Sequence, residues 1–178
     1  EETGAAQHLR DARITTIYEG TTGIQANDLI GRKVLRDGGR SMQALLAQID
    51  GVCAQLEAGD DAQLHAIGAR LREGSKSLAD SMRWILATGG KDLNAVLAGA
   101  VPFLHLCGVV CGGWQMARAA LAAQRKLAAD SGDADFYRAK IATARFFADQ
   151  DLSRPRWLAE ATLHAGASTM APGQAQFC

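Results

Sequence analysis

The sequence lacks net charge and is poor in aromatic residues. Its 19 Lys and Arg residues balance 19 Asp and Glu residues, so no long-range field draws in nucleic acid or an anionic membrane surface. Aromatic residues make up only 6% of the chain, whereas 48% of it is hydrophobic, which is typical of tightly packed helices and not of a β-sandwich. We therefore expect an all-α fold with one main packed unit and no nucleic-acid partner.

Cysteine is also scarce. Four cysteines in 178 residues are too few and too unevenly spaced to form a disulfide framework. Signal-peptide and transit-type patterns are absent as well, which favours a reducing, cytoplasmic location. Because the first residue is Glu1 and not methionine, we expect the sequence to begin inside a longer protein.

One uncharged run bears on membrane location. No charged side chain occurs between Asp92 and Arg118, a span long enough to cross a bilayer as a helix. Polar residues such as Asn94 and Gln115 interrupt the run, and no cluster of Lys and Arg flanks it. Since the centre of a helical bundle requires an uncharged helix too, we expect no transmembrane segment.

Apolar residues at intervals of three and four predict long helical segments after residue 38. The segments cover about residues 42–56, 64–85, 93–121 and 136–147. Asp60 and Asp92 are expected to cap the second and third segments, Pro102 to kink or divide the third, and Pro155 to break or restart the fourth. Short turns make neighbouring helices antiparallel, so the pattern predicts an up-and-down bundle over residues 38–178.

Residues 1–37 have a different organisation. The pattern predicts a helix over residues 3–14, a loop over 15–23 and an amphipathic helix over 24–36, which Gly38-Gly39 should end. The loop carries Glu19 beside an aromatic ring and between flanking glycines, and a carboxylate in a desolvated site of this kind can serve as a general base. From spacing alone, the favoured alternative is a helix cap, with Thr21 or Thr22 starting the helix and Glu19 solvated.

Three pieces of this segment follow one another in a fixed order and spacing. They are Arg10-Asp11-Ala12-Arg13-Ile14, Ile17-Tyr18-Glu19-Gly20-Thr21 and Ile24-Gln25. Together they resemble the signature near the C-terminus of acyl-CoA dehydrogenases, and the continuation through Lys33 is similar to the bacterial branch with an extra helical domain. The resemblance implies that residues 1–37 are the end of the C-terminal helical domain of that family, with its catalytic loop, and that residues 38–178 are the additional helical bundle.

The resemblance also implies an activity, the FAD-dependent oxidation of an acyl-CoA thioester to trans-2-enoyl-CoA, as in fatty acid β-oxidation. Glu19 would remove the α-proton while the β-hydrogen leaves as hydride to FAD. The thioester carbonyl would be polarised by the backbone N–H of Glu19 and a flavin ribityl hydroxyl. The implied partners are the acyl-CoA substrate, an electron-transfer flavoprotein or similar acceptor, and further copies of the chain in a homo-oligomer.

Individual residues around the base take their roles from the same resemblance. Tyr18 would line the acyl pocket, and Gly20 would let the thioester pass. Thr21, Thr22 and Gly23 would face FAD, although many members have Gln at the position of Gly23, so only a backbone contact is implied there. We expect the 178-residue chain alone to be inactive and not to retain FAD. The alternative is a non-catalytic helical scaffold or subunit-interaction module.

Two other constellations have simpler explanations. Cys107 and Cys111 lie one helical turn apart near His105, but a second ligand pair is missing, so we expect no metal site and buried free thiols instead. The aromatic residues fall at helical spacing and are expected to pack in the core. They are Trp84, Phe103, Trp114, Phe136, Phe146, Phe147 and Trp157.

Overall fold

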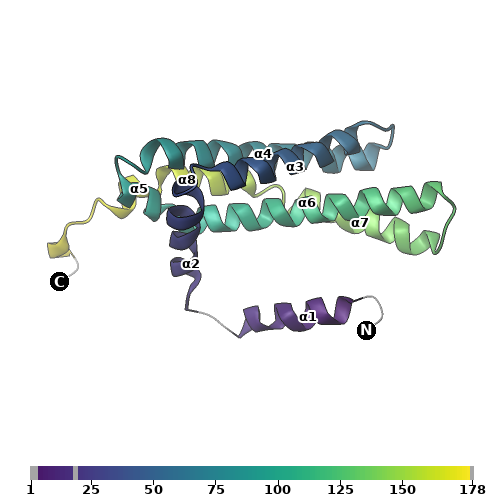
Figure 1. Ribbon diagram of the computed structural model, residues 1–178, viewed down its shortest axis with the longest axis horizontal. Coiled ribbons are helices and arrows are strands. Elements are labelled where there is room, and N and C mark those ends of the chain that lie inside the picture. The colour runs from purple at the N-terminus through teal and green to yellow at the C-terminus, as the bar shows by residue number, and fades with distance from the viewer. Residues whose placement is uncertain (1–3, 18–19, 177–178) are drawn as a thin grey trace.

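The computed structural model describes residues 4–17 and 20–176, which form helices and turns and no strand. Figure 1 shows an elongated bundle of long helices, with the N-terminal helix α1 set apart from it. The predicted all-α fold is confirmed. Tyr18 and Glu19, which carry the predicted acyl contact and the predicted base, lie outside the described residues.

The N-terminal segment consists of four short elements. They are α1 (Ala5–Arg13), the 3₁₀ helix η1 (Ile14–Thr16), α2 (Thr22–Asp28) and the π-helix η2 (Leu29–Leu35). No residue of α1 is buried, whereas α2 packs against α6, and Ala26, Ile30 and Val34 are fully buried. The prediction of one regular amphipathic helix over residues 24–36 was therefore wrong in detail: the segment changes from α-helix to π-helix at Leu29, and Ile24 is 67% exposed.

A glycine turn leads from η2 into the bundle. Gly38 and Gly39 both have left-handed backbone, with φ of 66° and 78°, which glycine adopts without steric cost. The Asp37 carboxylate accepts the backbone N–H groups of Gly39 and Ser41 at 2.8 and 3.0 Å, and hydrogen bonds from Ser41 lower the pKa of Asp37 below its ordinary value. The predicted helix end is confirmed. The division into two domains at this point stays a prediction, since one core contains residues from both sides of the turn.

The first two bundle helices are α3 (Arg40–Glu57) and α4 (Ala62–Thr88), which pack along each other. Asp61 caps α4 by accepting backbone N–H groups at 2.8 and 3.2 Å, one residue after the predicted cap, Asp60. Between the helices, Arg72 donates two hydrogen bonds to the Glu57 carboxylate, at 2.9 and 2.7 Å. These bonds lower the pKa of Glu57 and raise that of Arg72.

The third segment is divided into α5 (Leu93–Ala98) and α6 (Ala100–Ala128). Asp92 caps α5 as predicted, accepting the N–H of Ala95 at 2.9 Å. The division falls at Gly99 and not at Pro102, which lies in the first turn of α6, where a missing N–H costs no helical hydrogen bond. At Gly99 the chain passes so close to α8 that an added Cβ would lie 2.3 Å from the carbonyl oxygen of Thr162.

Two helices in succession form the fourth side of the bundle. They are α7 (Ala134–Gln150) and α8 (Pro155–Thr169), with Pro155 at the first helical position as predicted. Both helices pack against α4 and α6, and a short 3₁₀ helix, η3 (Gln174–Gln176), follows. Helix α6 thus lies in the middle of the bundle, in contact with α2, α3, α4, α7 and α8.

The core is mainly aliphatic. Fully buried side chains of α4 and α6 include Leu71, Leu78, Phe103 and Leu106. The prediction that the aromatic residues pack in the core holds for Phe103 and for the half-buried Trp84, Trp114 and Phe147, which pack against the core. It was wrong for Phe136, Phe146 and Trp157, which are 52–66% exposed. Helical spacing alone therefore did not distinguish the outer faces of α7 and α8 from their inner faces.

Candidate active-site segment

The segment that precedes α2 contains the described part of the predicted site. Gly20 has φ of 109°, a conformation that residues with a Cβ rarely adopt, and an added Cβ there would meet no atom within 4 Å. Gly23 is exposed in the first turn of α2 and would likewise leave an added Cβ without neighbours. An added side chain at either position would therefore contact no described neighbour.

Thr21 and Thr22 lie at the start of α2. Thr21 occupies the N-cap position, with its carbonyl oxygen accepting the N–H of Gln25 at 2.8 Å. Its side chain makes no capping hydrogen bond, so the usual reason for a threonine at this position does not apply here. The predicted loop over residues 15–23 is shorter than expected: residues 14–16 form η1, and Thr22 and Gly23 already belong to α2.

Basic side chains follow the motif on η2. Arg32 forms an ion pair with Asp28 at 3.0 Å, one helical turn away. Because its guanidinium is mostly exposed, the pair contributes little to stability. Lys33 and Arg36 are exposed on the same segment. Their arrangement is that of a solvated helix face, and they do not extend the site.

The two cysteines of α6, Cys107 and Cys111, are half-buried thiols. Desolvation raises the pKa of the Cys107 thiol to about 12 and also raises that of Cys111, so both stay protonated at neutral pH. Burial likewise raises the pKa of Cys53 to about 11. Residues 4–17 and 20–176 contain no group of three or more His, Cys, Asp or Glu side chains placed to hold a metal ion.

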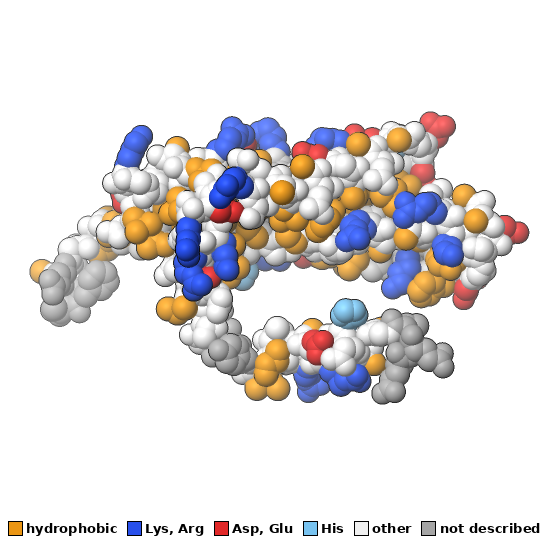
Figure 2. Space-filling model, in the orientation of Figure 1, with side chains coloured by type: hydrophobic (Ala, Val, Ile, Leu, Met, Phe, Trp, Pro, Cys, Tyr) orange, Lys and Arg blue, Asp and Glu red, His pale blue; other side chains and the backbone are white. Residues whose placement is uncertain are grey.

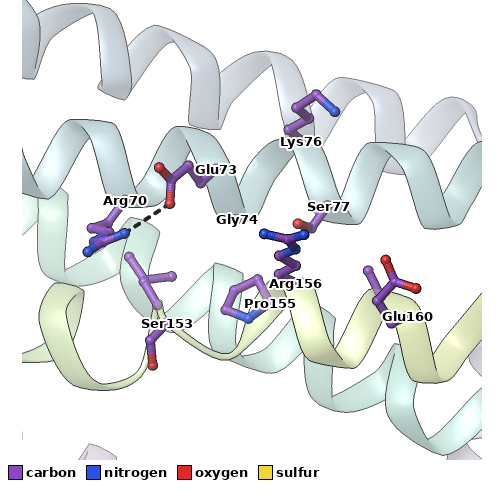
Figure 3. A pocket seen from close by; sticks show the side chains of 11 residues that line it. Arg70, Glu73, Gly74, Lys76, Ser77, Ser153, Pro155, Arg156 and Glu160 are labelled. Atoms are coloured by element: carbon purple, nitrogen blue, oxygen red, sulfur yellow. Dashed lines mark hydrogen bonds and ion pairs between the residues drawn. The ribbon is translucent and has the colours of Figure 1, made fainter.

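A groove of about 610 Å³ lies between α4 and the start of α8, away from the motif. Figure 3 shows Arg70 and Glu73 paired at one end of it, while Arg156 from α8 and Ser77 from α4 approach its middle. No pattern in the sequence indicates this groove, because residues about 80 positions apart form its two walls. Most of its charged groups already have partners, as in the 3.2 Å pair of Arg70 with Glu73 and the 3.0 Å pair of Lys76 with Asp80.

Helix α6 is long and apolar enough to cross a membrane by length and composition, and in the described part of the chain it alone meets this test. The central helix of a water-exposed bundle meets the same test. Here α6 packs along α3, α4, α7 and α8, and its buried side chains recur along its length.

Comparison with known proteins identifies the chain's relatives. Residues 45–172 match the family model described as acetyl-CoA dehydrogenase C-terminal like. The chain is 52% identical over 152 residues to 3-methylmercaptopropionyl-CoA dehydrogenase of Ruegeria pomeroyi, which covers 85% of the chain and 26% of that protein. It is 34% identical over 148 residues to a broad-specificity linear acyl-CoA dehydrogenase of Mycobacterium tuberculosis, covering 80% of the chain and 24% of that protein.

A third relative, a butyryl-CoA dehydrogenase of Syntrophomonas wolfei, is 30% identical over 150 residues, with coverage of 83% of the chain and 24% of that protein. The chain therefore spans about a quarter of the length of the curated relatives that it matches. The family model covers most of the bundle, from the second turn of α3 to just beyond α8. The chain belongs to the acyl-CoA dehydrogenase family and contains the helical domain that this C-terminal model describes.

Proposed function

We propose that the chain is the C-terminal part of an FAD-dependent acyl-CoA dehydrogenase and that Glu19 is its catalytic base. The observation that carries the proposal is the ordered motif over residues 10–25 within a chain that belongs to this family. Three relatives named as acyl-CoA dehydrogenases match the chain over at least 80% of its length. The proposed reaction is the oxidation of an acyl-CoA thioester to trans-2-enoyl-CoA.

Glu19 in this proposal abstracts the α-proton of the thioester. An α-proton is only modestly acidic, so the carbonyl oxygen must be stabilised where negative charge develops, and the backbone N–H of Glu19 donates to it. Tyr18 lines the acyl pocket beside the base. The positive φ of Gly20 supports its proposed role, because this conformation favours a residue without a Cβ next to the passing thioester.

FAD, when bound, accepts the β-hydrogen as hydride. The described residues fit a planar ring system close to the backbone, because the exposed start of α2 presents Gly23 without a neighbour on its Cβ side. Thr21 and Thr22 precede Gly23 and would hold the flavin with their backbone or hydroxyl groups. The Thr21 hydroxyl makes no capping bond that would compete with such a contact.

The proposal also covers the domain organisation of the chain and its parent enzyme. Residues 1–37 are proposed to end the C-terminal helical domain common to the family, and residues 38–178 to form an additional bundle; the left-handed pair Gly38-Gly39 supports a boundary there. Since the chain spans about a quarter of its relatives, we expect it to be inactive alone and to lack a complete FAD site. The parent enzyme is proposed to be a cytoplasmic homo-oligomer that passes electrons to an electron-transfer flavoprotein or similar acceptor.

The test uses the full-length parent enzyme and its Glu19→Gln variant. Acyl-CoA is added without oxygen, and bleaching of the flavin absorbance is followed for a panel that includes 3-methylmercaptopropionyl-CoA and butyryl-CoA, after the names of two relatives. Removing a general base should slow reduction by at least about 10²-fold, while the visible spectrum shows that FAD stays bound. Glu160→Gln, on an exposed position of α8, is the matched control and should reduce normally.

The outcome separates the dehydrogenase from the scaffold alternative. Rapid flavin reduction in Glu19→Gln would show that this carboxylate is not the base. A full-length protein without flavin would favour a non-catalytic scaffold or subunit-interaction module.

A further inference from the structure

A second groove runs between α3 and the C-terminal half of α6. Its volume is about 420 Å³, and its lining contains two guanidinium groups, two amides and no carboxylate. The lining residues are Val52, Gln55, Gln115, Arg118, Ala119, Leu121, Ala122 and Arg125. Figure 2 shows Lys and Arg side chains gathered over this half of α6.

The arrangement of the helices keeps carboxylates out of this groove. Helix α6 contains no Asp or Glu over its whole length. The two acidic residues of α3 are turned toward α4, where Asp50 accepts the hydroxyl of Ser75 at 3.3 Å and Glu57 accepts the guanidinium of Arg72 at 2.7 Å. In a chain with equal numbers of acidic and basic residues, this groove is therefore a local excess of positive charge.

Arg118 and Arg125 differ from most arginines of the bundle. Six others form ion pairs with carboxylates: Arg70, Arg72, Arg83, Arg138, Arg145 and Arg154. Within the residues that the structure describes, no ion pair reaches Arg118 or Arg125. Arg118 is instead held in place, donating to the Gln115 side chain at 3.0 Å with its guanidinium carbon 5.2 Å from the centre of the Trp114 ring. The two guanidinium groups are thus presented to solvent without counter-charges.

The shape of the groove favours a protein segment as its occupant. Pockets for small molecules enclose most of the ligand surface, whereas this groove is open along the helices and both arginines are exposed. Leu121 is half-buried and contributes apolar surface, and the exposed small side chains of Ala119 and Ala122 allow another backbone to come close. Arg118 and Arg125 are seven residues apart, about two helical turns or 10 Å along α6.

We propose that the α3–α6 groove binds an acidic amphipathic helix of a partner protein. Carboxylates seven residues apart on a helix lying along α6 match the spacing of Arg118 and Arg125. The apolar side of that helix packs over Leu121, Ala119 and Ala122, as in helix-in-groove recognition. This proposal goes beyond the dehydrogenase function and does not depend on Glu19.

A second copy of this chain does not fit the same groove well. Two helices have carboxylates seven residues apart, Asp50 and Glu57 on α3 and Glu73 and Asp80 on α4. All four carboxylates already accept hydrogen bonds or ion pairs within the chain. Docking them elsewhere would break these contacts, so α3 and α4 of a second copy are poor occupants of the groove.

The test measures binding of synthetic amphipathic helical peptides to the 178-residue chain by fluorescence anisotropy at low salt. One peptide carries Glu at two positions seven residues apart, and the matched peptide carries Gln at both. We expect the Glu peptide to bind at least about fivefold more tightly, since exposed ion pairs are weak one at a time and add when two form together. The preference should shrink as salt screens the charges.

Variants locate the binding. Arg118→Gln with Arg125→Gln should abolish the preference for the Glu peptide, whereas Arg138→Gln with Arg145→Gln, on α7 outside the groove, should preserve it. Arg118→Glu with Arg125→Glu should reverse it in favour of a Lys peptide. Because all four arginines are surface residues, circular dichroism should show unchanged folding.

Equal binding of the Glu and Gln peptides, or an unchanged preference in the Arg118→Gln, Arg125→Gln variant, would overturn the proposal. The proposal would also be overturned if ADP bound in place of the Glu peptide and its binding depended on the same two arginines. The groove would then be a phosphate site.

Discussion

Replacing Gly99 with alanine is expected to destabilise the bundle, because α5 and α8 meet there backbone to backbone. The added Cβ would lie 2.3 Å from the carbonyl oxygen of Thr162 and 3.1 Å from its carbonyl carbon and Cα. Backbone atoms cannot rotate away as a side chain does, so the helices must separate by about 1 Å, and overpacking of this kind costs about 1–3 kcal/mol. The backbone at Gly99, with φ of −87°, accepts alanine without strain, and the replacement itself contributes about 0.4–1 kcal/mol of stability.

The net expectation for Gly99→Ala is a loss of about 1–2 kcal/mol in the free energy of unfolding. Urea denaturation followed by circular dichroism measures it as a lower midpoint with an unchanged slope. Gly51→Ala is the matched control: Gly51 lies within α3 with open space around its Cβ position, so the change should stabilise by about 0.5–1 kcal/mol. If Gly99→Ala were as stabilising as Gly51→Ala, the close contact between α5 and α8 could not exist as described.

Three further changes test other parts of the structure. Ile30→Ala removes a fully buried side chain and should cost about 2–5 kcal/mol in urea denaturation, whereas the exposed Ile24→Ala should change stability by less than about 0.5 kcal/mol. Asp61→Ala should cost about 1 kcal/mol by removing the cap of α4; an equal loss in Asp60→Ala would contradict the cap assignment. Desolvation raises the pKa of Cys107 from 9.0 to about 12, so stability is full below pH 9 and falls between pH 9 and about 12, where only the unfolded chain loses this proton. The free energy of unfolding should therefore fall less between pH 8 and pH 10 in Cys107→Ala than in the unchanged chain.

The long helices were readable from the sequence because their determinants are local. Leu71, Leu78 and Ile85 recur on one face of α4, and all three are fully buried. Asp92 is a short acceptor placed directly before an apolar run, and it caps α5 as such residues do. Where neighbouring residues decide the structure, pattern and structure agree.

Other features depend on residues far along the chain. Pro102 was predicted to kink or divide the third helical segment, but the break between α5 and α6 lies at Gly99. There the backbone lies against that of Thr162, some 60 positions later in the chain. Phe146 and Trp157 fit a helical pattern and yet face solvent, because apolar spacing does not say which face of a helix is covered. The α3–α6 groove arises in the same way, from side chains that only packing brings together.

The candidate site was predictable in a different sense. Spacing around Gly20 indicated a loop before a helix, and the structure confirms that much, with glycine in a conformation suited to it. The role of Glu19 came from the ordered motif and not from physical chemistry, since a loop carboxylate next to a helix start is usually solvated. Its assignment as the base stays a prediction.

The π-helix over residues 29–35 affects how this chain should be aligned with its relatives. A π-turn holds one more residue than the α-turn that it replaces, so it is the structural form of a single-residue insertion. A relative with one residue fewer here can keep Ile30 and Val34 buried by closing the turn into an ordinary α-helix. A one-residue gap at this point of a sequence alignment would therefore mark a change from π-helix to α-helix and not the loss of a core contact.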